Sequence, residues 1–163
     1  MHDSSIILMR ALIAEYDADH GIIVDLGSMD VNGTYRDLFE AGKYIGADLQ
    51  PGQNVDVIVG NGGAWELMAL TADLVISGQT MEHVLDLPGF MKSIDHVLKP
   101  GGKMILIAPE NSVPHSYPDW AGNFDAEQMA DTVAEAGFKI LEVGTRPGPQ
   151  LNDTFCIAEK AVA

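Results

Sequence analysis

The chain has 163 residues and a formal net charge of −15, because 24 acidic side chains outnumber nine basic ones. This length suits one domain with a sizeable core, and a hydrophobic content of 47% excludes intrinsic disorder. Nucleic-acid phosphates and anionic membranes bind basic patches, so the charge argues against either as a partner. The simplest consequence of the acidity is solubility.

Two further features bear on location. Cys156 is the only cysteine and lies in an apolar run, so the sequence predicts no intrachain disulfide and favours a reducing cytoplasm. The apolar stretch Ile6–Met9 follows no basic region and is interrupted by Arg10, which is typical of neither a signal peptide nor a membrane span.

Residues 1–20 are expected to contain a leading helix that begins with Ser4 as its N-cap and runs to about Asp17. One face of this helix is apolar and is expected to pack on a sheet. Its members are Ile6, Met9, Leu12, Ile13 and Tyr16.

The next segment predicts the first half of a nucleotide-binding α/β domain. A buried strand over 22–25 leads into a loop over 26–33 that contains two glycines, then a helix over 34–41 and a strand over 43–47. Glycines let a ligand approach the backbone, and amides at a helix start point towards it. Asp48 ends the second strand, where a carboxylate accepts hydrogen bonds from ribose hydroxyls.

The loop chemistry discriminates between nucleotides. Met29 stands where a dinucleotide site has its second glycine, and Asp30 and Asp25 bring negative charge to the place that a pyrophosphate would occupy. No phosphate-binding P-loop motif occurs in the chain. Two carboxylates suit a ligand with an ammonium and a sulfonium, so the loop favours S-adenosylmethionine over a dinucleotide or ATP.

The remaining chain predicts alternating strands and helices. Strands are expected over 55–59, 73–77, 103–108, 138–145 and 153–159, and helices over 64–70, from Phe90 to Leu98, and after the capping box Asp125–Gln128 as far as Gly137. Residues 109–123 form a long irregular connection, which is typical of a functional, lid-like loop.

Four segments resemble, in order and spacing, the class I S-adenosylmethionine-dependent methyltransferases. These are 24–28, 44–49, 73–84 and 97–107. The resemblance implies an α/β fold in one domain over 1–163. It is a Rossmann-like, doubly wound seven-stranded sheet, mostly parallel with an antiparallel last strand and helices on both faces.

The resemblance also implies a set of cofactor-binding residues at the carboxyl ends of the strands. They are Asp25, Gly27, Ser28, Met29, Asp48, Leu49, Asn61, Ser77 and Gln79. Two positions depart from the family. Met29 replaces a loop glycine, and Gly60-Asn61 follow the third strand where the family has an acidic residue beside the adenine, although the Asn61 amide suits the adenine edge as well.

His83 is the first candidate for a general base, because histidine titrates near neutral pH. The alternative is that Glu82 and His83 only cap the following segment and line the pocket. His115 lies in a His-x-Tyr-Pro segment similar to a loop of one methyltransferase branch, but the arginine of that loop is absent here. That loop is either a lid or an acceptor wall. No cluster at metal-ligand spacing occurs, so no metal is predicted.

The sequence therefore predicts S-adenosylmethionine-dependent methyl transfer to a small or exposed acceptor by in-line displacement, with S-adenosylhomocysteine as product. The acceptor pocket is expected from the leading helix and the 109–123 loop, or from a second copy of the chain in a homodimer. Two alternatives stay open. One is a catalytically inactive S-adenosylmethionine-binding regulatory or structural protein, and the other is a dinucleotide oxidoreductase, which the loop disfavours.

Overall fold

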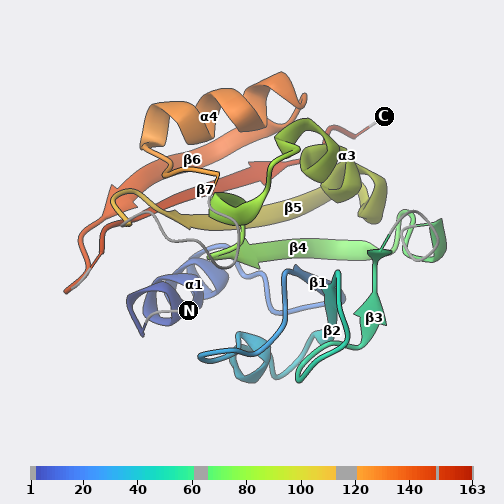
Figure 1. The fold of residues 1–163 in the computed structure, drawn as a ribbon. Coiled ribbons are helices and arrows are strands. Elements are labelled where there is room, and N and C mark those ends of the chain that lie inside the picture. The colour runs from blue at the N-terminus through green and yellow to red at the C-terminus, as the bar shows by residue number, and fades with distance from the viewer. Residues whose placement is uncertain (1–2, 61–65, 113–120, 150, 163) are drawn as a thin grey trace.

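A computed structural model describes residues 3–60, 66–112, 121–149 and 151–162. Its centre is a seven-stranded sheet with the strand order β3-β2-β1-β4-β5-β7-β6 (Figure 1). The strands are β1 Ile22–Leu26, β2 Lys43–Asp48, β3 Val57–Ile58, β4 Ala72–Gly78, β5 Leu98–Pro109, β6 Lys139–Arg146 and β7 Asp153–Glu159. The helices are α1 Asp3–Glu15, α3 Leu87–Val97 and α4 Ala126–Glu135, with 3₁₀ turns η1 Arg36–Leu38 and η3 Met81–His83.

The strand directions confirm the predicted fold class. Strands β1 to β5 pair in parallel, and β7 inserts antiparallel between β5 and β6. The chain leaves β1 towards β2 and β3 on one side and continues through β4 and β5 on the other, so the strand order reverses between β1 and β4. Ligands in such sheets bind beyond the carboxyl ends of the strands at this switch point.

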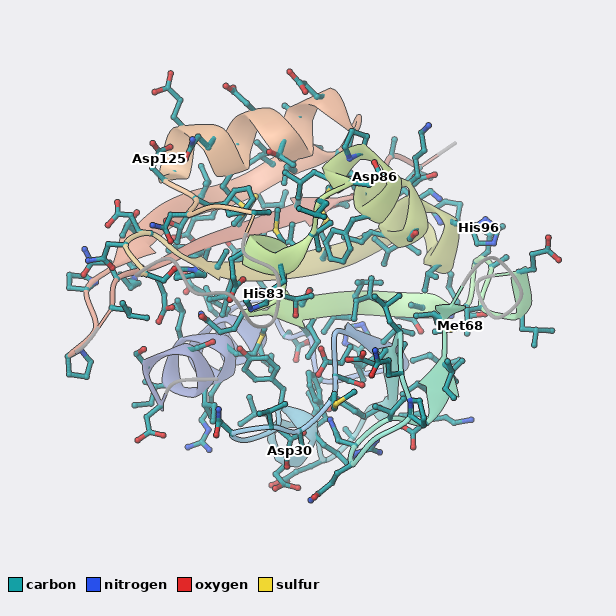
Figure 2. All side chains as sticks on the ribbon, viewed as in Figure 1. Asp30, Met68, His83, Asp86, His96 and Asp125 are labelled. Atoms are coloured by element: carbon teal, nitrogen blue, oxygen red, sulfur yellow. The ribbon has the colours of Figure 1, made fainter. Side chains whose placement is uncertain are left out.

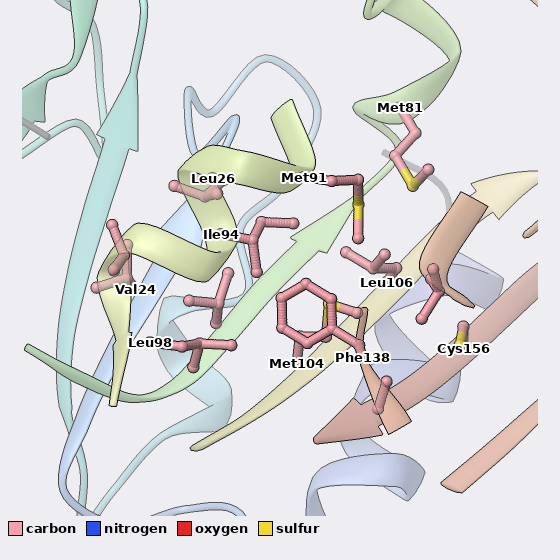
Figure 3. Close-up of a cluster of buried hydrophobic side chains, with 14 of the residues drawn as sticks. Val24, Leu26, Met81, Met91, Ile94, Leu98, Met104, Leu106, Phe138 and Cys156 are labelled. Carbon is pink, nitrogen blue, oxygen red and sulfur yellow. The ribbon is translucent and has the colours of Figure 1, made fainter. Parts of the chain in front are cut away.

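Two apolar layers hold helices against both faces of the sheet. On one face, α1 buries Met9 and Leu12 against residues such as Ile76 and Ile107. On the other face, α3 and α4 cover a second cluster around Met104 and Leu106 (Figure 3). Burying each such side chain contributes about 1.5–3 kcal/mol. The sheet is therefore fixed from both sides, and its carboxyl edge is a rigid platform.

The predicted helices after the fourth strand are largely confirmed. Asp86 caps α3 by accepting the Gly89 amide, so the helix begins at Leu87, just before Pro88. The capping box between Asp125 and Gln128 opens α4 as expected. The third strand is shorter than predicted, and the helix predicted over 64–70 lies partly outside the described residues.

Ser4 is not the cap of α1. It lies inside the helix, and its hydroxyl donates to Asp153 Oδ2 at 2.8 Å. The sequence alone gave no sign of this, because the partner is 149 residues away. The hydroxyl consequently ties the start of α1 to β7.

The helix predicted over 34–41 is wrong. Only the short turn η1 forms there, and the chain is extended again at Phe39. Three backbone amides that a helix would have used internally, those of Glu40, Ala41 and Gly42, donate to the Asp19 carboxylate at 2.8–3.2 Å. Burial raises the pKa of Asp19, but these hydrogen bonds outweigh it and hold the pKa below its ordinary value. The Asp19 carboxylate therefore takes the place of helical carbonyl groups as the hydrogen-bond acceptor of these three amides.

Candidate cofactor-binding site

The loop after β1 requires glycine at its first turn. Gly27 has a φ of +81°, and a Cβ at this position would run into the side chain of Thr80. Both Gly27 and Ser28 donate their amides to the Ala47 carbonyl, at 2.9 and 3.2 Å. The loop is thus held close to the end of β2, where Asp48 lies.

Asp48 lies against this loop. Its Oδ2 accepts the Met29 amide at 3.0 Å, and its Oδ1 accepts the Leu49 amide at 2.7 Å. The carboxylate is partly exposed, and each oxygen keeps a second acceptor site. The Met29 amide therefore donates to Asp48, although the sequence predicts that the amides of this loop point towards a ligand.

Met29 and Leu49 flank the carboxylate. The Met29 side chain packs against Gly52, where an added Cβ would come within 2.9 Å of Met29 Cγ. This contact explains how the loop accommodates methionine in place of glycine. The Leu49 side chain is 71% exposed at the strand end and offers an apolar surface beside Asp48.

Asp25 lies beneath the loop rather than on its surface. Its carboxyl group is buried and accepts the Tyr44 hydroxyl at 2.5 Å. Burial raises the pKa of Asp25 to about 7; the Tyr44 hydrogen bond opposes this shift, and the nearby Asp48 adds to it. Asp25 therefore supports the loop from below.

A polar network around Arg36 and Asn54 completes this support, and sequence reasoning missed it. Arg36 Nε donates to Asn54 Oδ1 at 2.6 Å, and Arg36 pairs with Asp56 at 2.5 Å while its guanidinium lies over the Tyr44 ring. Asn54 Nδ2 donates to the Ser28 carbonyl at 2.7 Å. Asn54 has a φ of +69°, a conformation that asparagine tolerates, so the presence of an asparagine in this turn was the one available sequence signal.

The end of β4 supplies the other side of the site. Ser77 is buried and donates to the Leu26 carbonyl at 2.7 Å, so it ties β4 to β1 and does not face the loop. Gln79 has a φ of +57°, unusual for a residue other than glycine. Its Nε2 donates to Asp153 Oδ1 at 2.8 Å, and its amide donates to the Ile107 carbonyl at 2.8 Å.

Tyr35 lies buried between these parts, a position that no local sequence pattern indicates. The ring is fully buried, its hydroxyl is hydrogen-bonded to Ser5 of α1, and a Cβ at Gly78 would collide with that hydroxyl. Burial raises the pKa of Tyr35 far above its ordinary value, and the carboxyl groups of Asp25, Asp153 and Glu82 add to the effect. The Tyr35 hydroxyl therefore contacts both α1, through Ser5, and the end of β4, at Gly78.

His83 and Glu82 follow in η3. Figure 2 shows His83 beside the carboxyl end of β4, whereas His96 lies near the end of α3 and is exposed. His83 Nε2 is 3.7 Å from Glu82 Oε1, and the His83 side chain is 24% exposed. The Glu82 carbonyl accepts the Ala121 amide at 2.5 Å, which anchors the end of the 109–123 connection.

Two polar residues after β5 have structural partners, and two predicted site residues lie outside the described part of the chain. Glu110 accepts Asn152 Nδ2 at 2.9 Å, and Asn111 accepts the Asn152 amide at 2.9 Å, so both hold the turn before β7. Asn61 and His115 lie outside the described residues. Within the described ranges, no group of three or more His, Cys, Asp or Glu side chains is placed to hold a metal ion. Over the same ranges, every helix is too short or too polar to cross a membrane.

Comparison with known proteins places this geometry in a family. The model of the methyltransferase domain family matches residues 9–143. Among curated proteins, none matches the chain. Many solved structures share the fold, and three of them are compared with the chain. The first is the 1,6-didemethyltoxoflavin-N1-methyltransferase of Burkholderia thailandensis, solved with 1,6-didemethyltoxoflavin and S-adenosylhomocysteine. It has 15% identity and a TM-score of 0.78, over 98% of this chain and 79% of that one.

The other two are similar at lower TM-scores. An S-adenosylmethionine-dependent methyltransferase from Aquifex aeolicus has 14% identity and a TM-score of 0.65, over 98% of both chains. The phosphoethanolamine N-methyltransferase 2 of Haemonchus contortus, solved with S-adenosyl-L-methionine, has 14% identity and a TM-score of 0.65, over 94% of this chain and 52% of that one. The chain belongs to the methyltransferase domain family and has the fold of the class I S-adenosylmethionine-dependent methyltransferases.

Proposed function

We propose that the chain binds S-adenosylmethionine at the carboxyl edge of β1, β2 and β4 and transfers its methyl group to a small or exposed acceptor. The observation that carries this proposal is the pairing of Asp48 with the Gly27–Met29 loop at the switch point of the sheet. The cofactor, when bound, supplies an electrophilic methyl group and a neutral thioether leaving group.

The side chains present at the site fit this cofactor. Asp48 keeps free acceptor positions for the ribose hydroxyls, and Leu49 offers an exposed apolar surface for the adenine. Asp25 and Asp48 lie close enough for their charges to interact. This acidic environment at the loop favours a cationic ligand, because opposite charges attract.

The chain's remaining task is to orient the acceptor and remove a proton where the acceptor carries one. His83 lies at the edge of the site and is partly exposed, so it is our candidate for passing this proton to solvent. Gln79, held by Asp153, fixes the end of β4 beside the reacting groups. His115, Asn61 and a homodimer contact remain proposals from the sequence.

Isothermal titration calorimetry with S-adenosylmethionine and S-adenosylhomocysteine tests the proposal. The wild type is expected to bind both ligands, and Asp48→Asn should weaken binding by about tenfold or more, because a charge-assisted pair of hydrogen bonds to the ribose is lost. Asp131→Asn, on the exposed face of α4, is the matched control and should bind like the wild type. Absence of binding to the wild type, or equal binding by both variants, would contradict the proposal.

A search for turnover then separates an enzyme from an inactive binding protein. S-adenosylhomocysteine formation on a panel of small acceptors supports transfer. Tight cofactor binding with no turnover on any acceptor would favour the regulatory or structural alternative.

A further inference from the structure

The Glu82 carboxyl group is buried without a full set of partners. Its side chain is 6% exposed, and among the described residues Oε2 has no hydrogen-bond partner. The other oxygen, Oε1, faces His83 Nε2 at 3.7 Å, which is beyond a hydrogen bond. A buried carboxyl oxygen without a donor costs free energy, so such a group beside the candidate site points to a missing donor.

The neighbouring groups do not supply that donor. Asp153 lies close enough to raise the pKa of Glu82, and its two oxygens are already occupied by Ser4 and Gln79. The Gln79 side-chain NH₂ group donates to Asp153, and the remaining side-chain oxygen of Gln79 can only accept a hydrogen bond. The Tyr35 hydroxyl is engaged with Ser5. Apart from its own backbone amide, which donates to the carboxyl group, the described surroundings of Glu82 are therefore rich in acceptors and poor in donors.

The charge around Glu82 is mostly negative. The titratable groups of the packed elements around Glu82 and Tyr35 are Asp25 of β1, Asp153 of β7 and His83 of η3. The amino terminus of the chain also acts on Glu82, and its positive charge opposes the rise of the Glu82 pKa. Burial raises the pKa of Glu82 to about 7, and Asp153 adds to this shift. A ligand that brings N–H donors and a positive charge would relieve both the unpaired oxygen and the repulsion.

We propose that Glu82 recognises an amine on the methyl acceptor and takes up its proton. This inference rests on the proposed function, and it narrows the acceptor to the amine class. The acceptor ammonium gives one proton to Glu82 Oε2, which frees the nitrogen lone pair. That pair forms the new N–C bond, and the pair of the broken C–S bond stays on sulfur. The proton leaves Glu82 for solvent by way of His83, whose ring lies at 3.7 Å and is partly exposed.

The first test follows the titration of Glu82 directly. Protein labelled with ¹³C at glutamate carboxyl carbons is saturated with S-adenosylhomocysteine, and the Glu82 signal is assigned from its loss in Glu82→Gln. Ethylammonium chloride is the probe, because it is small enough to be independent of the rest of the acceptor pocket. Potassium chloride at the same ionic strength and ethanol are the controls.

Ethylammonium is expected to lower the pKa of Glu82 by about one unit or more, while ethanol and potassium chloride leave it unchanged. By linkage, binding of ethylammonium should weaken about tenfold in Glu82→Gln. Glu127→Gln, on the surface of α4, should bind like the wild type. S-adenosylhomocysteine should bind all three proteins equally.

Two results overturn the inference. One is a pKa of Glu82 that is the same in ethylammonium chloride as in potassium chloride. The other is a folded Glu82→Gln variant that binds ethylammonium as tightly as the wild type does. If that variant does not fold, the wild-type titration alone decides. The Glu82 signal is then assigned by NMR correlations that link it to the backbone of adjacent residues. Failure of S-adenosylhomocysteine to bind the wild type would instead reject the proposed function, so the two failures are distinguishable.

Discussion

At the scale of single residues, two buried carboxyl groups make the fold sensitive to pH. Burial raises the pKa of both Asp25 and Glu82 to about 7. In the unfolded chain both groups ionise near pH 4, so between about pH 4 and pH 7 the folded state binds more protons than the unfolded state. The stability that these groups contribute is present at low pH and is lost as the pH rises through 7.

We therefore expect the free energy of unfolding to fall between pH 5 and pH 8, and to fall less in Asp25→Asn. The asparagine keeps an oxygen for the Tyr44 hydroxyl but carries no charge to bury. Urea unfolding at both pH values measures the difference. Asp131→Asn is the control, and a slope in Asp25→Asn as steep as that of the wild type would show that Asp25 is not the titrating group.

The residues predicted from the sequence fall into two groups for a physical reason. The places of Gly27 and Asp48 at the ends of β1 and β2 were predictable, because strand ends and turns fix backbone positions locally. The burial of Asp25 and of Glu82, and the inward position of Ser77, depend on packing between segments far apart in the chain. Tyr35 was missed for the same reason, since its partner Ser5 is 30 residues away on another element.

At the scale of elements, the strands and the capped helices were predictable and the helix over 34–41 was not. Buried apolar runs predicted β1, β4 and β5, and the Asp125–Gln128 capping box predicted α4, because these signals are local. The chain after Tyr35 has helical propensity, but Asp19 binds its amides and Arg36 reaches across to Asp56. Tertiary contacts therefore override propensity in this segment.

Removing the Asp19 carboxylate tests this account. Asp19→Ala is expected to lower the free energy of unfolding by about 1–3 kcal/mol, because three backbone amides lose a charged acceptor. Asp37→Ala changes an exposed aspartate of the same segment and should alter stability by less than about 0.5 kcal/mol. Urea denaturation compares the two, and equal effects would mean that the Asp19 hydrogen bonds do not organise the segment.

At the scale of the whole molecule, the sheet order explains why the site lies where it does. Because β1 and β4 are neighbours whose connections leave in opposite directions, the loop after β1 and the turn after β4 meet above their carboxyl ends. Helix α1 is tied to the same edge through Ser4 and Ser5. The seven-stranded order was predictable only through the family resemblance, because strand pairing between distant segments leaves no local signal.

The measurement that tests the central claim most directly is a ¹⁵N–¹H titration of the assigned protein with S-adenosylhomocysteine. We predict that the amides of Gly27, Met29, Leu49 and Gln79 shift saturably with ligand, at the carboxyl edge of the sheet. The amides of Gly101 and Gly102, in the first part of β5 near the opposite edge of the sheet, should stay unchanged. Shifts confined to the opposite edge, or no saturable shift at all, would contradict a cofactor site at the carboxyl edge.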